Sequence, residues 1–269
     1  MKKHTTIKLG RLLVATLALI GVFVSANSSL LADVKSPKRI IVGTGNAFKP
    51  YCYLDEDGKL VGFEYEVLKE INKRLPQYKF EYQTMDFPNI LLSLNSGKID
   101  IAAHEYAKNK EREKKYLFAN EFYTIVATKI TVLSSRNDIH SITDLYGKKV
   151  QVSPGSNDAY ILESYNKEHG NKINLIYGAL DAATLVQNLK TGSIDATTQF
   201  TRNVDSINKA YGDVIKTVGD SLYNSYTYHI FRKDEVGLRD DVDKALRQLK
   251  SDGTLSKISL KILGKDYTK

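Results

Sequence analysis

The chain carries one short phrase twice, once in each half: LNSGKID at 94–100 and LKTGSID at 189–195. Leucine, glycine, isoleucine and aspartate occupy matching positions in the two copies. Glycine after a helical pattern is typical of a helix end, because glycine tolerates the positive φ that the turn requires. We therefore predict that each copy ends a helix at its glycine and begins a strand at its Ile-Asp pair.

Alone, such a phrase is a common helix stop, so the order of elements around it decides whether the fold is duplicated. Hydrophobic periodicity predicts strand, helix, strand, helix, strand around each copy. The predicted strands are 39–43, 78–83, 99–103, 149–153, 173–177 and 194–198, and the predicted helices are 64–75, 90–94, 110–116, 158–169, 182–189, about 203–210, 242–250 and 255–262. This order indicates an α/β fold of two lobes, each with a parallel sheet covered by helices.

Two β-rich runs, 124–133 and 225–231, predict extended crossings between the lobes, so that the last helices return to the first lobe. One lobe is then 37–126 plus 231–269, and the other is 127–230. Ligands of open α/β sheets bind beyond the carboxyl ends of the strands. The residues after each repeat, 104–112 and 199–202, are therefore expected to face a shared cleft.

The first 32 residues differ from the rest. Four cations precede an apolar run, 12–24, and small residues follow, a pattern typical of a secretory signal peptide spanning 1–32. Cleavage is expected after Ala26 or Ala32, with an uncleaved N-terminal anchor as the alternative. The sequence thus predicts a secreted, extracellular or cell-surface protein.

Cysteine and histidine usage argues against a metal or a disulfide. Cys52 is the only cysteine, which leaves no intrachain disulfide and no cysteine for a lipid anchor near the mature N-terminus. The five histidines show no metal-ligand spacing. We expect neither a metal nor a cofactor.

The charge balance says little about partners. The four cations of the signal segment account for half of the net charge of +8. The remainder allows weak attachment to an anionic cell wall, with plain solubility as the alternative. No Lys/Arg cluster is interleaved with aromatic residues, so nucleic acid is not expected as a partner. We expect a monomer.

Catalytic motifs are not found. Gly43-Thr44-Gly45 follows a strand, but Phe48 stands where a dinucleotide-binding loop needs its third glycine. His104 and Glu105 resemble an acid–base pair, yet neighbours on a strand point to opposite faces. No residue group argues for an enzyme.

Two features suit an anion. The segment 153–157, SPGSN, follows a strand and opens a helix, whose free N–H groups and dipole favour a carboxylate. Arg112 lies in a short helix that Asn109 is expected to cap, and its fork can bind a carboxylate through two hydrogen bonds. The alternative is that Arg112 is one solvated charge in the run KEREKK.

At these residues the sequence resembles the family of extracellular solute-binding proteins that deliver polar amino acids to ABC importers. The similar stretches are "GKLVGFEYEVLKEI", "LLSLNSGKIDIAAHEYAKNKEREKKYLFANEFYT", "ITDLYGKKVQVSPGSN", "LKTGSIDA" and "ALRQLKSDGTLSKISLKILGKDYT", which together span nearly all of the mature chain. "AHEYAKNKEREKKYLF" and "LGKDYT" are most similar to the cystine-binding branch of Gram-positive bacteria. The resemblance implies a type II periplasmic-binding-protein fold, in which two lobes joined by two hinge strands close on one amino acid.

The resemblance also implies roles for individual residues. Arg112 matches the arginine that binds the ligand carboxylate. The second-lobe loop that closes on the same carboxylate matches Gly155, Ser156 and Asn157, and the aromatic and pocket-lining positions match Phe48, Phe87, Ala103, His104, Glu105 and Ala107.

One position departs from the family pattern. Many relatives carry an aspartate for the ligand ammonium where this chain has Phe200. The ammonium then needs another carboxylate, for which Glu105 is the first candidate and Asp158 the second. The alternatives are a ligand that is not a standard α-amino acid, or a register that differs by a residue or two.

Taken together, the residues and the resemblance imply a secreted, non-enzymatic binding protein that delivers an amino acid to an ABC importer. L-cystine is the expected ligand, because its two charged ends suit Arg112 together with polar His104 and Glu105. Two other classes stay open: a dehydratase-like enzyme on the same fold, and a surface adhesin or sensor module.

Overall fold

The computed structural model of the chain describes residues 36–179 and 181–269. The predicted signal peptide and both of its cleavage sites lie outside these residues. Within them, no helix combines the length and the apolarity that crossing a bilayer would need.

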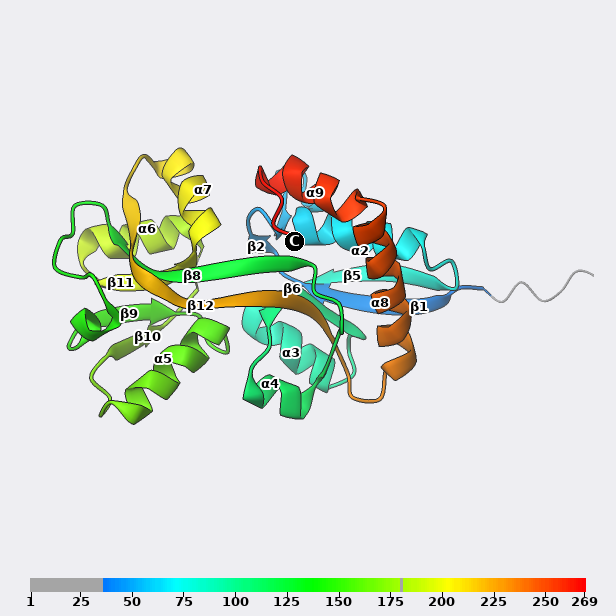
Figure 1. The fold of residues 1–269 in the computed structure, drawn as a ribbon, viewed down its shortest axis with the longest axis horizontal. Coiled ribbons are helices and arrows are strands. Elements are labelled where there is room, and N and C mark those ends of the chain that lie inside the picture. The colour runs from blue at the N-terminus through cyan, green and yellow to red at the C-terminus, as the bar shows by residue number, and fades with distance from the viewer. Residues whose placement is uncertain (1–35, 180) are drawn as a thin grey trace, which may run out of the picture. The chain divides into compact units, whose positions relative to one another are not determined.

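A nine-stranded sheet spans residues 38–231. Its strands lie in the order β10 (Asn174–Tyr177), β9 (Lys149–Val152), β11 (Ala196–Phe200), β8 (Thr124–Leu133), β12 (Ile215–Phe231), β6 (Ile101–Ala107), β1 (Lys38–Thr44) and β5 (Tyr78–Thr84), and β7 (Leu117–Phe118) pairs with β12. Its two central strands are the long antiparallel pair β8 (Thr124–Leu133) and β12 (Ile215–Phe231). These are the predicted crossings, and Figure 1 shows them running from one group of elements to the other. The expectation of two α/β lobes joined by two strands is confirmed.

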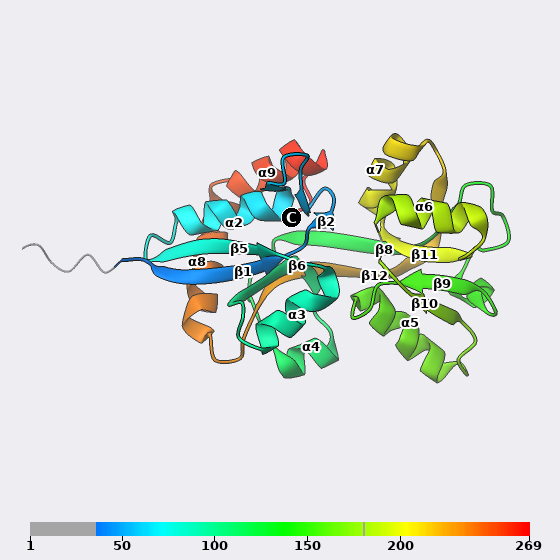
Figure 2. The same ribbon diagram turned by 180° about the vertical axis from the view of Figure 1, so that it is seen from behind.

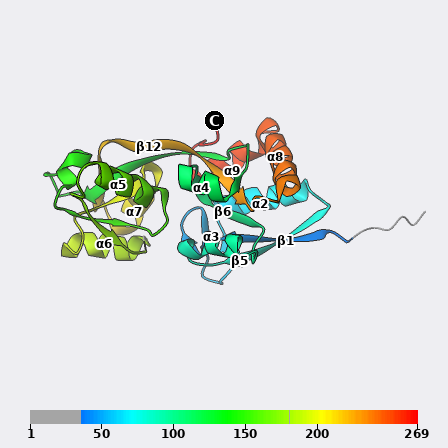
Figure 3. The ribbon, with the colours of Figure 1, turned by 90° about the horizontal axis from the view of Figure 1, so that it is seen from below.

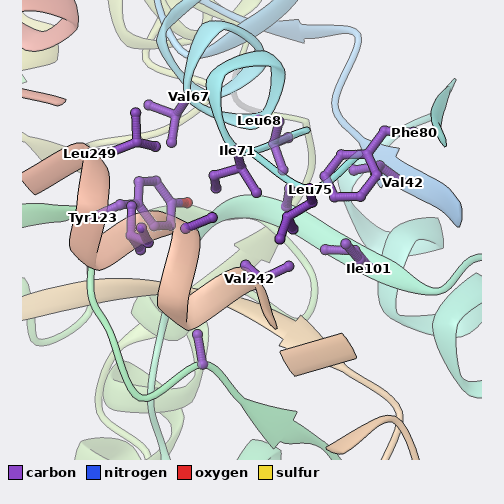
Figure 4. Packing of buried hydrophobic residues seen from close by; sticks show 14 of the residues in the cluster. Val42, Val67, Leu68, Ile71, Leu75, Phe80, Ile101, Tyr123, Val242 and Leu249 are labelled. Carbon is purple, nitrogen blue, oxygen red and sulfur yellow. The ribbon is translucent and has the colours of Figure 1, made fainter. Parts of the chain in front are cut away.

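The first lobe is built on three parallel strands, β1 (Lys38–Thr44), β5 (Tyr78–Thr84) and β6 (Ile101–Ala107). Apolar side chains of the sheet pack on one face against the amphipathic helices α2 (Phe63–Lys73), α8 (Val236–Ser251) and α9 (Thr254–Leu263). Figure 4 shows part of this core, in which Val67 and Ile71 of α2 lie near Val242 and Leu249 of α8. On the other face, α3 (Phe87–Asn95) buries Ile90 and Leu94 in a second core.

The second lobe repeats this plan with β9 (Lys149–Val152), β10 (Asn174–Tyr177) and β11 (Ala196–Phe200). The helix α5 (Asn157–Glu168) covers one face, and α6 (Ala182–Thr191) and α7 (Thr201–Tyr211) cover the other. Figures 2 and 3 show the same division from behind and from below, with β12 between the two groups. The predicted lobe boundaries at 126/127 and 230/231 fall inside β8 and β12 and stay a prediction.

The remaining elements are short. They are β2 (Ala47–Phe48), β3 (Cys52–Leu54) and β4 (Leu60–Val61), which form a small separate sheet, then α4 (Lys110–Lys115), β7 (Leu117–Phe118) and the 3₁₀ helix η1 (Ile142–Leu145).

The repeated phrase has the same structural role in both lobes. Its glycines, Gly97 and Gly192, have φ near +70°, which confirms that each ends a helix. The Asp100 carboxylate accepts a hydrogen bond of 2.7 Å from the Ile41 backbone N–H at β1, and Asp195 accepts one of 2.8 Å from Lys149 at β9. Each aspartate therefore ties the third strand of its lobe to the first strand.

An arginine completes this arrangement in each lobe. Arg232, just after β12 ends, donates to Asp100 at 3.0 Å, and Arg136, shortly after β8 ends, donates to Asp195 at 2.8 Å. The phrase thus joins the sheet of each lobe to the crossing strand that ends there. Because the aspartates bind at this junction, β6 and β11 begin after them, at Ile101 and Ala196, and the predicted strand starts were two residues too early.

Two elements begin well before their predicted starts, β12 at Ile215 and α8 at Val236. The second crossing begins at Ile215 rather than at 225. Residues 219–221 break the β pattern in the sequence, but the strand continues past them through a register shift between Val218 and Tyr223. The helix α8 begins at Val236, about a turn and a half before the predicted start.

Candidate ligand-binding site

A cavity of about 370 Å³ lies between the lobes, at the carboxyl ends of the parallel strands. Nine of the ten residues in the predicted binding set line it: Phe48, Phe87, His104, Glu105, Ala107, Arg112, Ser156, Asn157 and Phe200. The tenth, Gly155, lines a neighbouring cavity of about 180 Å³ that Arg112 also borders. Ala103 is buried in the first-lobe core and lies outside the lining, so its expected place in the pocket was wrong.

Arg112 is buried, with 6% of its surface exposed, while its neighbours in the charged run are exposed. Asn109 caps the short helix as predicted, accepting a hydrogen bond of 2.9 Å from the Arg112 backbone N–H. The guanidinium donates to the Ala107 carbonyl at 2.9 Å and to the Gly155 carbonyl of the second lobe at 2.8 Å. Among the described residues no carboxylate forms an ion pair with it. Burial lowers the pKa of Arg112 below its ordinary range, so the site favours an incoming anion.

The N-terminus of α5 faces the cavity beside this arginine. Ser156 caps the helix by accepting a hydrogen bond of 3.0 Å from the Ala159 N–H, and Asn157 accepts one of 3.1 Å from Asn109 across the cleft. Gly155, at φ +71°, turns its carbonyl toward Arg112. The helix dipole and the guanidinium therefore favour negative charge at the same end of the cavity.

Aromatic rings form the wall at β2 and α3. Phe48 stacks on His104 with ring centroids 4.7 Å apart and planes 7° apart, and Phe87 packs against the same imidazole at 4.7 Å with its plane tilted by 48°. Phe200 of the second lobe meets Phe48 edge-on. Burial, aided by the charge of Arg112, lowers the pKa of His104 to about 4, so the imidazole is neutral at pH 7. This wall offers an apolar surface to the middle of a ligand.

Asp158, the second residue of α5, is one of the acids that line the cavity. Its carboxylate oxygens accept hydrogen bonds from the Thr198 hydroxyl at 2.6 Å and the Tyr223 hydroxyl at 2.7 Å. Burial raises the pKa of Asp158, against the opposing effect of these two donors and of Arg112. No Lys, Arg or His of the described chain forms an ion pair with it. A half-buried carboxylate held by neutral donors suits a ligand cation.

Glu105 departs from two expectations. Its φ of +51° interrupts the alternation of the strand, so Glu105 and His104 both line the cavity instead of facing opposite sides. Its Oε2 already accepts hydrogen bonds from Arg202 at 2.6 Å and Thr124 at 2.7 Å. Because that charge is compensated inside the protein, Asp158 replaces Glu105 as the first candidate for a ligand ammonium.

The sequence reasoning missed several lining residues. Asn46, Asp86, Tyr106, Asp181 and Tyr223 carried no motif, because strand curvature and loop folding rather than spacing bring them to the cavity. Asp158 follows the SPGSN segment directly, and that neighbourhood was the only usable signal for it.

Cys52 lies just behind the cavity wall. The thiol is fully buried, and a Cβ placed on Gly45, a lining residue, would fall 3.0 Å from its sulfur and 2.6 Å from the His104 ring nitrogen Nε2. Burial first, and the nearby Glu64 charge second, raise the pKa of Cys52 well above its usual value. Gly45, which has no side chain, is therefore a point at which the backbone of the cavity wall passes close to this thiol.

Comparisons with known proteins agree with the geometry. The L-cystine-binding protein TcyK of Bacillus subtilis is 44% identical over 88% of both chains. A solved structure of a proposed L-cystine ABC transporter protein from Listeria monocytogenes is 47% identical, with a TM-score of 0.82 over 86% of this chain and 98% of that one. A chain from a study of glutathione import through GshT and the cystine importer TcyBC of Streptococcus mutans is 31% identical, with a TM-score of 0.79 over 87% of this chain and 98% of that one.

The family assignment follows from the extent of the match. Residues 40–265 match the model of the bacterial extracellular solute-binding proteins, family 3. That span takes in both lobes, both crossing strands and the lining of the cavity. The chain therefore belongs to family 3 of the bacterial extracellular solute-binding proteins.

Proposed function

We propose that this protein binds a zwitterionic amino acid, L-cystine first, and delivers it to an ABC importer. One observation carries the proposal: a buried arginine and a half-buried aspartate border the same cavity, and neither has an oppositely charged partner in the described chain. An α-amino acid supplies both missing charges at once, with a carboxylate for Arg112 and an ammonium for Asp158.

The roles of the remaining lining residues follow from this pair. The α-carboxylate takes the N–H groups at the start of α5 together with the guanidinium fork. The ammonium lies against Asp158, and the side chain extends along Phe48, Phe87 and Phe200. Because these contacts come from both lobes, the ligand stabilises the form in which the lobes are together.

The aromatic wall of the cavity and the polar side chains at its open end favour cystine over smaller amino acids. A disulfide-linked middle suits the aromatic rings, since sulfur packs well against aromatic groups. Polar side chains at the open end, Asn46 and Asp86, are joined at 3.1 Å and offer both a donor and an acceptor to a second zwitterionic end. The similarity to proteins named for L-cystine supports the same ligand.

The cellular setting belongs to the same proposal. The protein is exported by a signal peptide over 1–32, acts outside the membrane as a monomer without catalysing a reaction, and meets the permease of an ABC importer. Its family of extracellular solute-binding proteins supports export and transport. Attachment to an anionic wall is weak and electrostatic.

A ligand screen tests the proposal. Thermal shift against all amino acids, cystine and glutathione should give a saturable rise in Tm with cystine, and chemical analysis should recover the cystine unchanged. No shift with any zwitterion contradicts the binding proposal, and a converted ligand supports an enzyme.

Asp158→Asn tests the ammonium role. It keeps the shape and removes the charge, so it should weaken cystine binding by about 2–5 kcal/mol, at least tenfold. A ligand analogue that lacks the amino groups should bind wild type and variant alike. Asp205→Asn, on the exposed side of α7, is the matched control and should bind normally. Equal loss for both ligands would assign Asp158 a structural role instead.

A further inference from the structure

Arg202 reaches from the second lobe into the first. It is the second residue of α7, and its guanidinium donates to the Glu105 carboxylate at 2.6 Å, the Tyr51 hydroxyl at 2.6 Å and the Ile125 carbonyl at 3.0 Å. The guanidinium also lies over the ring of Tyr267, 4.9 Å from its centroid. These partners come from the first lobe and the start of β8.

This ion pair is among the most buried on the molecule. The side chains of Arg202 and Glu105 are 7% and 1% exposed, whereas the other arginine–carboxylate pairs keep one or both partners more open to solvent. Asn203, the next residue of α7, accepts a hydrogen bond of 2.7 Å from the same Tyr51 hydroxyl. Arg202 and Asn203 thus bind one group of first-lobe residues, Tyr51 and Glu105, which we call the socket.

The socket is built around a second buried acid. The Glu105 N–H donates to Glu64 at 3.2 Å and to the Tyr123 hydroxyl at 2.9 Å, and Tyr123 donates to Glu64 in turn. Glu105 is held at φ +51°, a conformation that costs a non-glycine residue energy and that the surrounding contacts must maintain. Its Oε1 is buried without a hydrogen-bond partner among the described residues.

We propose that Arg202 and Glu105 form a proton-linked latch: the arginine holds the lobes together while Glu105 is ionised, and Glu105 takes up a proton when the lobes part. The inference rests on the proposed function only in assuming that the lobes move. It adds to that function a positioning residue, Arg202, that touches no ligand, and a pH dependence of closure.

The physical reason is the loss of a counter-charge. When Arg202 leaves, the titratable groups of the described chain that interact with Glu105 are Tyr51, Cys52 of β3, Glu64 of α2 and Tyr123, and none of them is a cation. His229 of β12 lies 3.9 Å from Glu64, and burial lowers its pKa to about 3, so it is neutral at pH 7. Glu64 belongs to the same lobe as Glu105 and stays beside it when the lobes part. A carboxylate that has lost its cation and still faces a second acid takes up a proton more readily, because a like charge disfavours the ionised form.

The sign of the pH dependence follows. Burial raises the pKa of Glu105, and Arg202 opposes that rise only in the closed form. Closing therefore releases a proton. The closed form, and with it ligand affinity, is favoured as pH rises through the interval between the pKa values of the closed and open forms.

A distance measurement without ligand tests the latch. Cys52 is buried, so spin labels can be attached at Leu92→Cys on α3 and Lys167→Cys on α5, both exposed positions on different lobes. Pulsed electron paramagnetic resonance then gives the populations of short and long distances between the labels from pH 8 to pH 5. Circular dichroism at each pH confirms that the protein stays folded. The label pair is combined with wild type, Arg202→Gln, Glu105→Gln and Arg136→Gln.

In wild type, acid should shift the population toward the long distance. Arg202→Gln should lower the ratio of closed to open by about tenfold or more at pH 8. Glu105→Gln should abolish the pH response, and Arg136→Gln, which removes an arginine–aspartate pair inside one lobe, should behave as wild type.

Three results would overturn the latch. They are a wild-type pH response that Glu105→Gln retains, an Arg202→Gln distribution equal to that of wild type, and a single distance in every variant at every pH. Because the distance measurement uses no ligand, its result tests the latch whether or not the ligand screen detects binding. Failure of the latch and failure of the proposed function can therefore be told apart.

Discussion

Replacing Arg112 by alanine separates the cost of losing a ligand contact from the cost of disturbing the fold. The side chain is 6% exposed and makes two hydrogen bonds, to the Ala107 and Gly155 carbonyls, but no described carboxylate pairs with it. The change therefore removes the main counter-charge of the bound carboxylate and breaks no ion pair within the described chain.

The magnitudes differ accordingly. Leaving the ligand carboxylate buried without its cation costs about 2–5 kcal/mol, a loss in affinity of about 25-fold to a few thousand-fold. The unfolding free energy should fall by only about 1 kcal/mol, because the relief of a poorly compensated buried charge offsets the lost hydrogen bonds. Arg112→Lys keeps the charge but not the planar fork of donors, so its affinity for cystine should lie between those of wild type and Arg112→Ala.

Calorimetric titration with cystine, and urea unfolding of the same samples, measure the two quantities. Lys114→Ala, at an exposed position of the same helix, is the control and should change neither. Binding of Arg112→Ala within threefold of wild type would show that this arginine is not the carboxylate site.

Two further predictions concern stability. Asp100→Ala and Asp195→Ala should each lower the unfolding free energy by about 2–3 kcal/mol, since each leaves a strand N–H and an arginine without their acceptor. Urea unfolding measures this change. A loss below about 0.5 kcal/mol in either variant would contradict the role assigned to the repeat. Burial lowers the pKa of His229 to about 3, so the folded protein keeps this imidazole neutral where the unfolded chain would protonate it. The contribution of His229 to the unfolding free energy is therefore full above about pH 6.5 and is lost as pH falls toward 3, at up to about 1.4 kcal/mol per pH unit. His229→Phe should remove this dependence, so its unfolding free energy should fall less steeply in acid than that of wild type. Unfolding curves of wild type and His229→Phe that stay parallel from pH 7 to pH 4 would contradict it.

The duplicated order of elements was predictable because it depends on local patterns. Helix ends at Gly97 and Gly192 and the cap at Asn109 are set by neighbours in sequence, and all three are confirmed. The strand starts after the repeats were not predictable, because the contacts that set them, from Asp100 to Ile41 and from Asp195 to Lys149, are distant in sequence.

The lining of the cavity was predictable where sequence order and spatial position coincide. Residues that follow the repeats, such as His104 and Phe200, line the cavity because strand ends meet there. The partnership of Glu105 with Arg202 could not be predicted, since it depends on a positive φ and on how two lobes meet. Without that contact, the sequence ranked Glu105 ahead of Asp158, an order that the ion pair of Glu105 with Arg202 reverses.

The single cysteine gains a meaning when the proposed cargo is a disulfide. A thiolate beside bound cystine would attack it, release one cysteine and leave the other half covalently attached to the protein, which would then carry no further cargo. The reactive form is the thiolate, and burial together with the nearby Glu64 favours the unreactive thiol form of Cys52. We therefore expect Cys52, behind Gly45, to remain a thiol beside the proposed ligand, so that cystine would be released with its sulfur–sulfur bond intact.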